Sequence, residues 1–187
     1  RSSNGVSAIA AADVWVMAPQ TETAESTVPL RPADIYRVRG VPGVAEAVPL
    51  IQATVSLRAG PGLTTAGTLY GLDDVTLTGA PATYALGGPE DLRRPEAITM
   101  DLLSFERLWP GRLAALQAGA PAPEPGGALA VLEINDRRAV VTAVTDVLPG
   151  FGAPGVLQAR AANAALWAPD ARPTFVLVRA AGDPEAV

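Results

Sequence analysis

The sequence of 187 residues contains no cysteine, no histidine and no lysine, and these absences restrict its chemistry. Without cysteine and histidine it cannot form a disulfide, a Cys/His zinc site, a histidine general base or a thiol nucleophile. Any catalysis would therefore depend on carboxylates, hydroxyls or arginine. All 14 basic residues are arginine, which we interpret as the result of a GC-rich coding sequence rather than of a functional need for guanidinium groups.

Positive charge and long apolar runs are also scarce. The formal net charge is -5 and the sequence pI is about 4.7, so we expect no nucleic-acid partner, because phosphate binding needs clustered positive charge. No stretch reaches the ~18–20 consecutive apolar residues of a membrane-spanning helix. The sequence begins at Arg1 without a signal peptide and ends where Asp183 and Pro184 would start a new helix, so we expect it to be part of a longer protein.

The apolar content is nevertheless large enough for a substantial core. Hydrophobic residues make up 49% of the sequence and aromatic residues only 5%, so alanine and valine must fill much of that core. Glycine and proline, 18 of each, indicate many turns between short elements. The length is that of one domain, or of a core with a second lobe.

The first part of the sequence has the pattern of a β-α-β-β unit. Residues 13–17 are apolar on both alternating faces, which predicts a central strand. A short helix is predicted to begin at Pro32. Residues 51–58 alternate between apolar and polar side chains, and a second extended run over 63–72 follows Gly60-Pro61-Gly62, so we expect a β-hairpin whose edge a partner strand could join.

Residues 74–148 are rich in turns and are interpreted as an inserted smaller lobe. An extended stretch over 96–100 leads into a helix that begins at about Asp101. Segments 128–134 and 137–148 are predicted to form a hairpin about Asn135-Asp136.

A second β-α-β unit is predicted to close the chain. Its helix is the alanine-rich segment 156–167, and its last strand is the segment 174–178, which is apolar on both faces. The fold class is therefore α+β, with a discontinuous core of residues 1–73 and 149–187 around the lobe 74–148.

One motif suggests a nucleotide site. Residues 150–155 match G-x-G-x-x-G between a predicted strand and a predicted helix. However, Pro154 lacks an N–H group for a pyrophosphate, and Asp170 comes too early to hold a ribose. We interpret the motif as a Gly/Pro connector.

Adjacent carboxylates occur at Asp73-Asp74 and Glu90-Asp91. Neighbours on a strand point to opposite faces, so we interpret both pairs as parts of surface turns. An alternative, motivated by Asp73, Asp74 and Asp101, is a carboxylate-dependent extracytoplasmic hydrolase or a cation-binding enzyme. A second alternative is a soluble periplasmic ligand-binding or scaffold module.

Tryptophans and paired arginines are the remaining candidates for binding. Trp15, Trp109 and Trp167 lie on apolar patterns and are predicted to pack in the core. The pairs Arg93-Arg94 and Arg137-Arg138 are predicted to be solvated, although they could also dock an acidic patch of a partner.

Taken in order, several stretches resemble the extracytoplasmic core domain of MacB/FtsX-like ABC transporter permeases, including the DevC-like branch. The stretches that carry the resemblance are residues 12–17, 38–50, 69–73, 97–101, 140–144 and 175–187. The sequence departs from the family after the inserted helix, where Leu108-Trp109-Pro110-Gly111 is followed by the loop 118–127 in place of a Leu-Gly and Gly-Asp pattern.

The resemblance implies a porter-like β-α-β framework in two halves with an inserted, smaller, β-rich, Sabre-like lobe. It implies a domain between the first two transmembrane helices of an inner-membrane permease, on the periplasmic side. In that family the domain carries no catalytic residue, cofactor or metal, and ATP is hydrolysed on a separate ATP-binding subunit or domain. The implied partners are that subunit, a second permease copy in a homodimer, and an adaptor (membrane-fusion protein), lipoprotein or substrate. The partner-binding residues are unknown.

Overall fold

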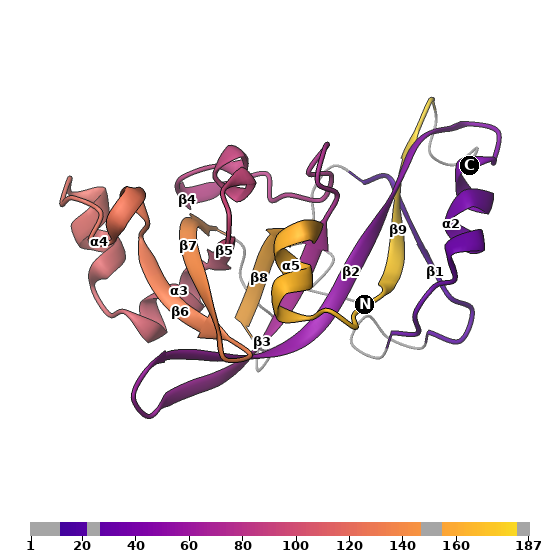
Figure 1. Cartoon of the computed structure of the whole chain (residues 1–187). Coiled ribbons are helices and arrows are strands. Elements are labelled where there is room, and N and C mark those ends of the chain that lie inside the picture. The colour runs from indigo at the N-terminus through magenta and orange to yellow at the C-terminus, as the bar shows by residue number, and fades with distance from the viewer. Residues whose placement is uncertain (1–11, 22–26, 147–154, 183–187) are drawn as a thin grey trace.

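The computed structural model describes residues 12–21, 27–146 and 155–182, and within them the chain is an α+β protein, as predicted (Figure 1). Its nine strands form one mixed sheet. The strands are β1 (Val14–Met17), β2 (Val44–Gly60), β3 (Leu63–Leu72), β4 (Tyr84–Leu86), β5 (Ala97–Asp101), β6 (Ala130–Ile134), β7 (Arg137–Thr145), β8 (Gly155–Arg160) and β9 (Pro173–Ala180). The helices are α2 (Pro32–Arg39), α3 (Leu102–Leu108), α4 (Arg112–Gln117) and α5 (Ala161–Trp167), with 3-10 turns η1 (Pro89–Arg93) and η2 (Pro125–Gly127).

Six of the strands close on themselves into a ring. The sheet runs in the order β1-β9-β2-β3-β8-β5-β7-β4, and β6 pairs with both β7 and β2. The strands β2, β3, β8, β5, β7 and β6 therefore form a small barrel. Such closure pairs strand edges that would otherwise be free, over part of their length.

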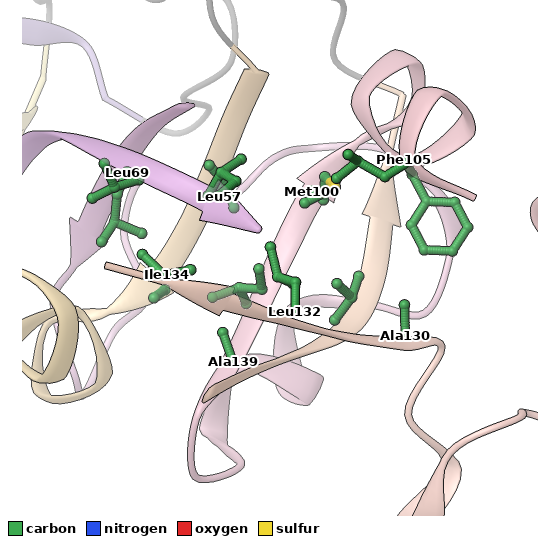
Figure 2. Close-up of a cluster of buried hydrophobic side chains, with 14 of the residues drawn as sticks. Leu57, Leu69, Met100, Phe105, Ala130, Leu132, Ile134 and Ala139 are labelled. Atoms are coloured by element: carbon green, nitrogen blue, oxygen red, sulfur yellow. The ribbon is translucent and has the colours of Figure 1, made fainter. Parts of the chain in front are cut away.

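The interior of the ring holds the largest hydrophobic cluster. Leu57, Met100, Ile134 and Leu157 are each fully buried and come from four different strands. Figure 2 shows the side chains of Leu57, Met100 and Ile134, with those of Leu69 and Leu132, converging on one interior space beside Phe105 of α3. Each strand turns alternate residues inward, which explains the alternating pattern over 51–58.

The other end of the molecule is an open sheet of β1, β9 and the first part of β2, with α2 packed on one face (Figure 1). Pro32 at the first helical position and Asp34 in the first turn favour the start of α2, and the helix ends at Gly40. Its Ile35 and Val38 pack on the buried side chains of Val176 and Val178.

The prediction that residues 13–17 form a central strand is wrong. Within the described residues β1 pairs only with β9, so it lies at the edge of the sheet. Its two-sided apolar pattern arises because Trp15 packs on Phe175 on one face while Val14 and Val16 pack beneath α2 on the other.

The 17-residue strand β2 connects the open sheet with the ring. It pairs with β9 from Val44 to Ile51 and with β3 from Ile51 onward. Between Leu50 and Ile51 the register shifts by one residue of β9, and the side chains of β2 keep their alternation between its two faces. Leu50 belongs to a cluster shared with β9, whereas Leu57 points into the ring.

The predicted helix over 156–167 is wrong in its first part. Residues Gly155–Arg160 form strand β8, and only Ala161–Trp167 are helical. β8 lies between β3, with which it pairs in parallel, and β5, and its first five residues are buried. Pairing and burial on both sides outweigh the local helical preference of the alanine-rich sequence.

Most other predicted elements are confirmed. These are the helix from Pro32, the hairpin of β2 and β3, the strand before the Asp101 helix, the β6–β7 hairpin about Asn135 and Asp136, and the last strand. The strands of segment 74–148 continue the same sheet through β5–β8 and β6–β2 pairing. The division into core and lobe stays a prediction.

Candidate functional site

Asp101 is the most buried of the candidate carboxylates and acts as a structural connector. It is fully buried at the end of β5, where its Oδ1 accepts the Ser104 N–H at 2.8 Å and so caps α3. Its Oδ2 accepts the N–H of Val156 in β8, also at 2.8 Å. Both oxygens are therefore occupied by backbone donors. The sequence predicted a helix start here, but it contained no signal for the bond to Val156.

Asp73 and Asp74 face different partners. Asp73 Oδ2 accepts the N–H groups of Val75 and Thr76, which closes the turn after β3. Asp74 Oδ1 accepts the N–H of Ala162 at 3.0 Å, where the positive end of the α5 dipole favours a carboxylate. The structure does not bring these two side chains to a common substrate position.

The second acidic pair, Glu90-Asp91, lies in η1. Asp91 Oδ2 accepts the Gly88 N–H at the start of this turn, and Glu90 pairs with Arg93 at 2.7 Å. Both acidic pairs thus serve turns, as predicted. In the residues described, no three Asp or Glu side chains gather where they could hold a metal ion.

The glycine-rich motif at 150–155 lies outside the described residues except for Gly155. Gly155 begins strand β8, whereas a dinucleotide fingerprint needs a helix directly after its glycines. A Cβ at Gly155 would lie 2.3 Å from Ser104 Oγ. We infer that this glycine is required by the close approach of α3 and β8.

The three tryptophans pack in the core, as predicted. Trp15 stacks edge-on against Phe175, and Trp109 packs on Phe105, each with ring centroids 5.1 Å apart. Trp167 is buried and donates its Nε1–H to the carbonyl of Arg138 at 3.0 Å.

The arginine pairs are mostly engaged within the chain. Arg93 bonds Glu90 and two backbone carbonyls, and Arg94 bonds the carbonyl of Gly126. Arg138 pairs with Glu96, while Arg137 is exposed at the start of β7. A patch able to dock an acidic partner is therefore smaller than the sequence suggested.

The β2–β3 hairpin offers little free edge. The edge of β2 pairs with β9 as far as Ile51 and with β6 at Leu57 and Arg58, and the outer edge of β3 pairs with β8 from Gly67 onward. In the described parts of the chain, the outer edge of the hairpin lacks a partner strand at residues 52–55 and at the tip, 59–66. Between these two stretches, Ser56 bonds Asn135. The edge expected for strand addition is therefore divided into two short stretches, because the ring and the open sheet pair the residues between and beyond them.

A hollow of about 740 Å³ lies between the end of β1 and the start of α2. Arg31 lies at its rim and pairs with Asp34 at 3.0 Å, and Arg37 pairs with the same carboxylate at 3.4 Å. The hydrogen bond from Arg31 lowers the pKa of Asp34, which keeps the carboxylate ionised beside both arginines. Tyr36 is 68% exposed on the same helix. Among its described residues, this surface combines apolar and basic groups and has no nucleophile beside a general base.

Comparisons with known proteins bear on the fold. No family model matches the sequence, and no curated protein matches it. Solved structures do match, and those described below are an extracellular domain of an ABC-type transporter and the periplasmic region of MacB. The resemblance found in the sequence is thus confirmed at the level of the fold.

Two of these structures match nearly the whole chain. The first is the extracellular domain of the noncanonic ABC-type transporter YknZ from Gram-positive bacteria, at 14% identity and a TM-score of 0.55, covering 91% of this chain and 84% of that chain. The second is the periplasmic region of MacB from Actinobacillus actinomycetemcomitans, at 12% identity and a TM-score of 0.53, covering 90% and 74%. No helix in the described residues is both long and apolar enough to cross a membrane.

Proposed function

We propose that this chain is a non-catalytic extracytoplasmic domain of an ABC transporter permease. In this role it couples motion driven by ATP hydrolysis on a separate ATP-binding subunit to export, or to an adaptor, lipoprotein or substrate outside the membrane. The observation that carries the proposal is the match of the fold, over about nine-tenths of this chain, to the YknZ and MacB domains. The engagement of Asp73, Asp74 and Asp101 with backbone donors supports a structural rather than a catalytic role for these groups.

The arrangement of the first and last strands supports a position between two membrane segments. Asp13 N–H donates to the Val178 carbonyl at 2.8 Å, and Asp13 Oδ2 accepts the Ala180 N–H at 2.8 Å. The described chain therefore enters and leaves at the same end of the molecule. In the proposed permease this end, with β1, β9 and α2, faces the membrane.

The long strand β2 supports a role in transmitting motion. It extends from the open sheet into the ring and spans 17 residues, or roughly 55 Å at the usual rise per strand residue. A displacement of the open sheet would reach the ring through this strand. In the proposed architecture, residues 1–73 and 149–187 form the porter-like framework, and 74–148 form the inserted Sabre-like lobe.

The location can be tested with single cysteines, because the chain has none of its own. Val75 is 76% exposed and Leu72 is fully buried. In intact cells that produce a full-length permease whose other cysteines are replaced, V75C is expected to react with a membrane-impermeant maleimide. L72C is expected to react only after denaturation. Labelling of V75C only after lysis would contradict an extracytoplasmic location.

Coupling and dimer formation can be tested with spin labels. Tyr36 on α2 and Leu63 at the hairpin tip are exposed. Helix α2 and the tip of the β2–β3 hairpin lie near opposite ends of the molecule (Figure 1). With one label per protomer at either position in the reconstituted transporter, we expect an inter-protomer distance that changes when ATP is bound. A missing inter-protomer distance would contradict the homodimer, and a distance unaffected by nucleotide would contradict coupling.

A further inference from the structure

The ring has two short joints, and they differ in their surroundings. β2 and β3 share nine residue pairs and β3 and β8 share six. β5 and β8 share two pairs, and β2 and β6 also share two, Leu57 with Ile134 and Arg58 with Glu133. We use the word seam for the joint between β2 and β6. With two residue pairs each, these two joints have the fewest backbone pairs in the ring, and the one that is less covered by other groups is the weaker.

The β5–β8 joint is covered on both faces. All five residues of β5 and the first five of β8 are buried, and Asp101 adds a hydrogen bond across the joint to Val156. Asn163 of α5 bonds the carbonyl of Ala97 in β5 from one side. Water therefore has no direct access to this joint.

The seam, by contrast, is open to solvent at its outer pair. The side chains of Arg58 and Glu133 are 49% and 42% exposed, and hollows lie on both sides of them. One hollow, of about 300 Å³, lies toward Asn135 and Asp136. The other, of about 420 Å³, lies between Ala59–Pro61 of the hairpin and Val131–Leu132 of β6. Beyond Arg58 the two strands are no longer paired, and the second hollow occupies the space between them.

Asn135 compensates for the shortness of the seam. Its backbone N–H donates to the Ser56 carbonyl at 3.0 Å, and its side-chain Oδ1 accepts the Ser56 N–H at 2.9 Å. Its Nδ2 donates to the carbonyl of Trp167 at the end of α5, at 2.9 Å. The positive φ angles of Asn135 and Asp136 form the tight turn that brings this side chain to β2. One turn residue thus joins β2, the β6–β7 hairpin and α5.

Charged groups add a second contact across the seam. Arg58 pairs with Glu133 and, at 3.4 Å, with Asp136. Both pairs are exposed, so salt weakens them, and they hold the strands less firmly than buried backbone pairing does.

We propose that the seam is a clasp, closed by Asn135 and Arg58, at which the ring opens locally while its other joints stay intact. In the opened state the β2–β3 hairpin parts from the β6–β7 hairpin, and the edges of β2 and β6 become free. The opening lets the hairpin shift relative to β6 and β7 without unfolding the core around Met100 and Leu157. This proposal concerns the chain itself and does not depend on the transporter assignment.

Hydrogen exchange in the full 187-residue chain tests the clasp. The amide of Ser56 reports the seam, and the amide of Val156 reports the buried joint. After correction for intrinsic rates, we expect Ser56 to exchange at least about tenfold faster than Val156 and with a weaker dependence on denaturant. Equal rates with equal denaturant dependence would show that the ring opens only by global unfolding, and would overturn the proposal.

Variants at Asn135 sharpen the test. N135G keeps the backbone conformation of the turn but removes the side-chain bonds, so Ser56 is expected to exchange about tenfold faster still while Val156 is unchanged. Equal acceleration of both amides would mean that Asn135 supports global stability, which contradicts the clasp. If N135G does not fold, E133Q serves instead, and E90Q is its control because it breaks an exposed ion pair, with Arg93 in η1, that involves no residue of β2, β6 or β7.

A disulfide across the seam should have the opposite effect to N135G, because it holds β2 and β6 together. Arg58 and Glu133 are direct cross-strand neighbours, so the oxidised R58C/E133C variant closes the seam. We expect Ser56 exchange in the oxidised form to slow toward the Val156 rate and to recover when the disulfide is reduced. An unchanged Ser56 rate in the locked protein would overturn the proposal.

Discussion

Asp101 and Val156, 55 residues apart in the sequence, are joined by a buried hydrogen bond of 2.8 Å from the Val156 N–H to Asp101 Oδ2. The other oxygen of the same carboxylate caps α3 through Ser104. One side chain therefore fixes both the direction in which the chain leaves β5 and the position of β8 beside it. This explains why an acidic residue occupies a fully buried position beside a largely apolar cluster.

Replacing Asp101 tests this role. D101A removes both acceptors and leaves two buried N–H groups without partners, so we expect a loss of about 3 kcal/mol in the free energy of unfolding. D101N keeps one acceptor, and we expect about half that loss. Urea unfolding followed by circular dichroism measures both. A loss below about 1 kcal/mol in D101A would contradict the structural role, and D170N, at an exposed position, is the control.

Gly155 and Ser104 form the tightest contact beside Asp101. A Cβ at Gly155 would lie 2.3 Å from Ser104 Oγ and 3.1 Å from its Cβ, so G155A is expected to destabilise the protein by about 2 kcal/mol. S104A removes the closer atom. The double variant G155A/S104A is therefore expected to be more stable than the sum of the two single effects predicts. Strict additivity in urea unfolding would show that the two positions do not touch.

The sequence predicted those elements whose signals are local. The β2–β3 hairpin follows from the alternation over 51–58 and from Gly60-Pro61-Gly62, and α2 follows from Pro32 and the glycines behind it. Asn135 was predicted as a turn residue. In each case the information lies within a few neighbouring residues.

What the sequence could not predict depends on contacts between distant segments. The ring closes because Leu57 meets Ile134, and β8 is a strand because it fits between β3 and β5. The predicted helix over 156–167 forms only from Ala161 onward, because tertiary pairing overrides the local helical preference up to Arg160. The bond between Asn135 and Ser56 likewise has no local signal, since any hairpin turn of this kind favours asparagine.

Gly67 tests the packing of the ring interior. A Cβ at this position would lie 2.6 Å from a methyl group of Leu157 and 2.9 Å from one of Leu57, both of which are fully buried. We expect G67A to cost about 1–3 kcal/mol in thermal or urea unfolding. The double variant G67A/L157V is expected to lose less than the sum of the two single losses, because the shorter valine side chain draws back from residue 67. G60A, in the same hairpin and with open space around it, is expected to have little effect. Equal effects of G67A and G60A would contradict the packing of the ring.

Tyr84 on β4 makes the stability of the protein sensitive to alkaline pH. Burial, and then the negative charge of Asp91, raise the pKa of Tyr84 to about 12. An unfolded tyrosine ionises near pH 10, so between about pH 10 and 12 the unfolded chain releases a proton that the folded chain retains. The folded state therefore loses stability as the pH rises through this interval.

Y84F, which cannot ionise, is expected to lose less stability than the wild type between pH 8 and 11, as measured by the urea midpoint. Y36F, at an exposed tyrosine, is the control and should follow the wild type. The same loss in Y84F as in the wild type would show that the folded environment does not hold the proton on Tyr84.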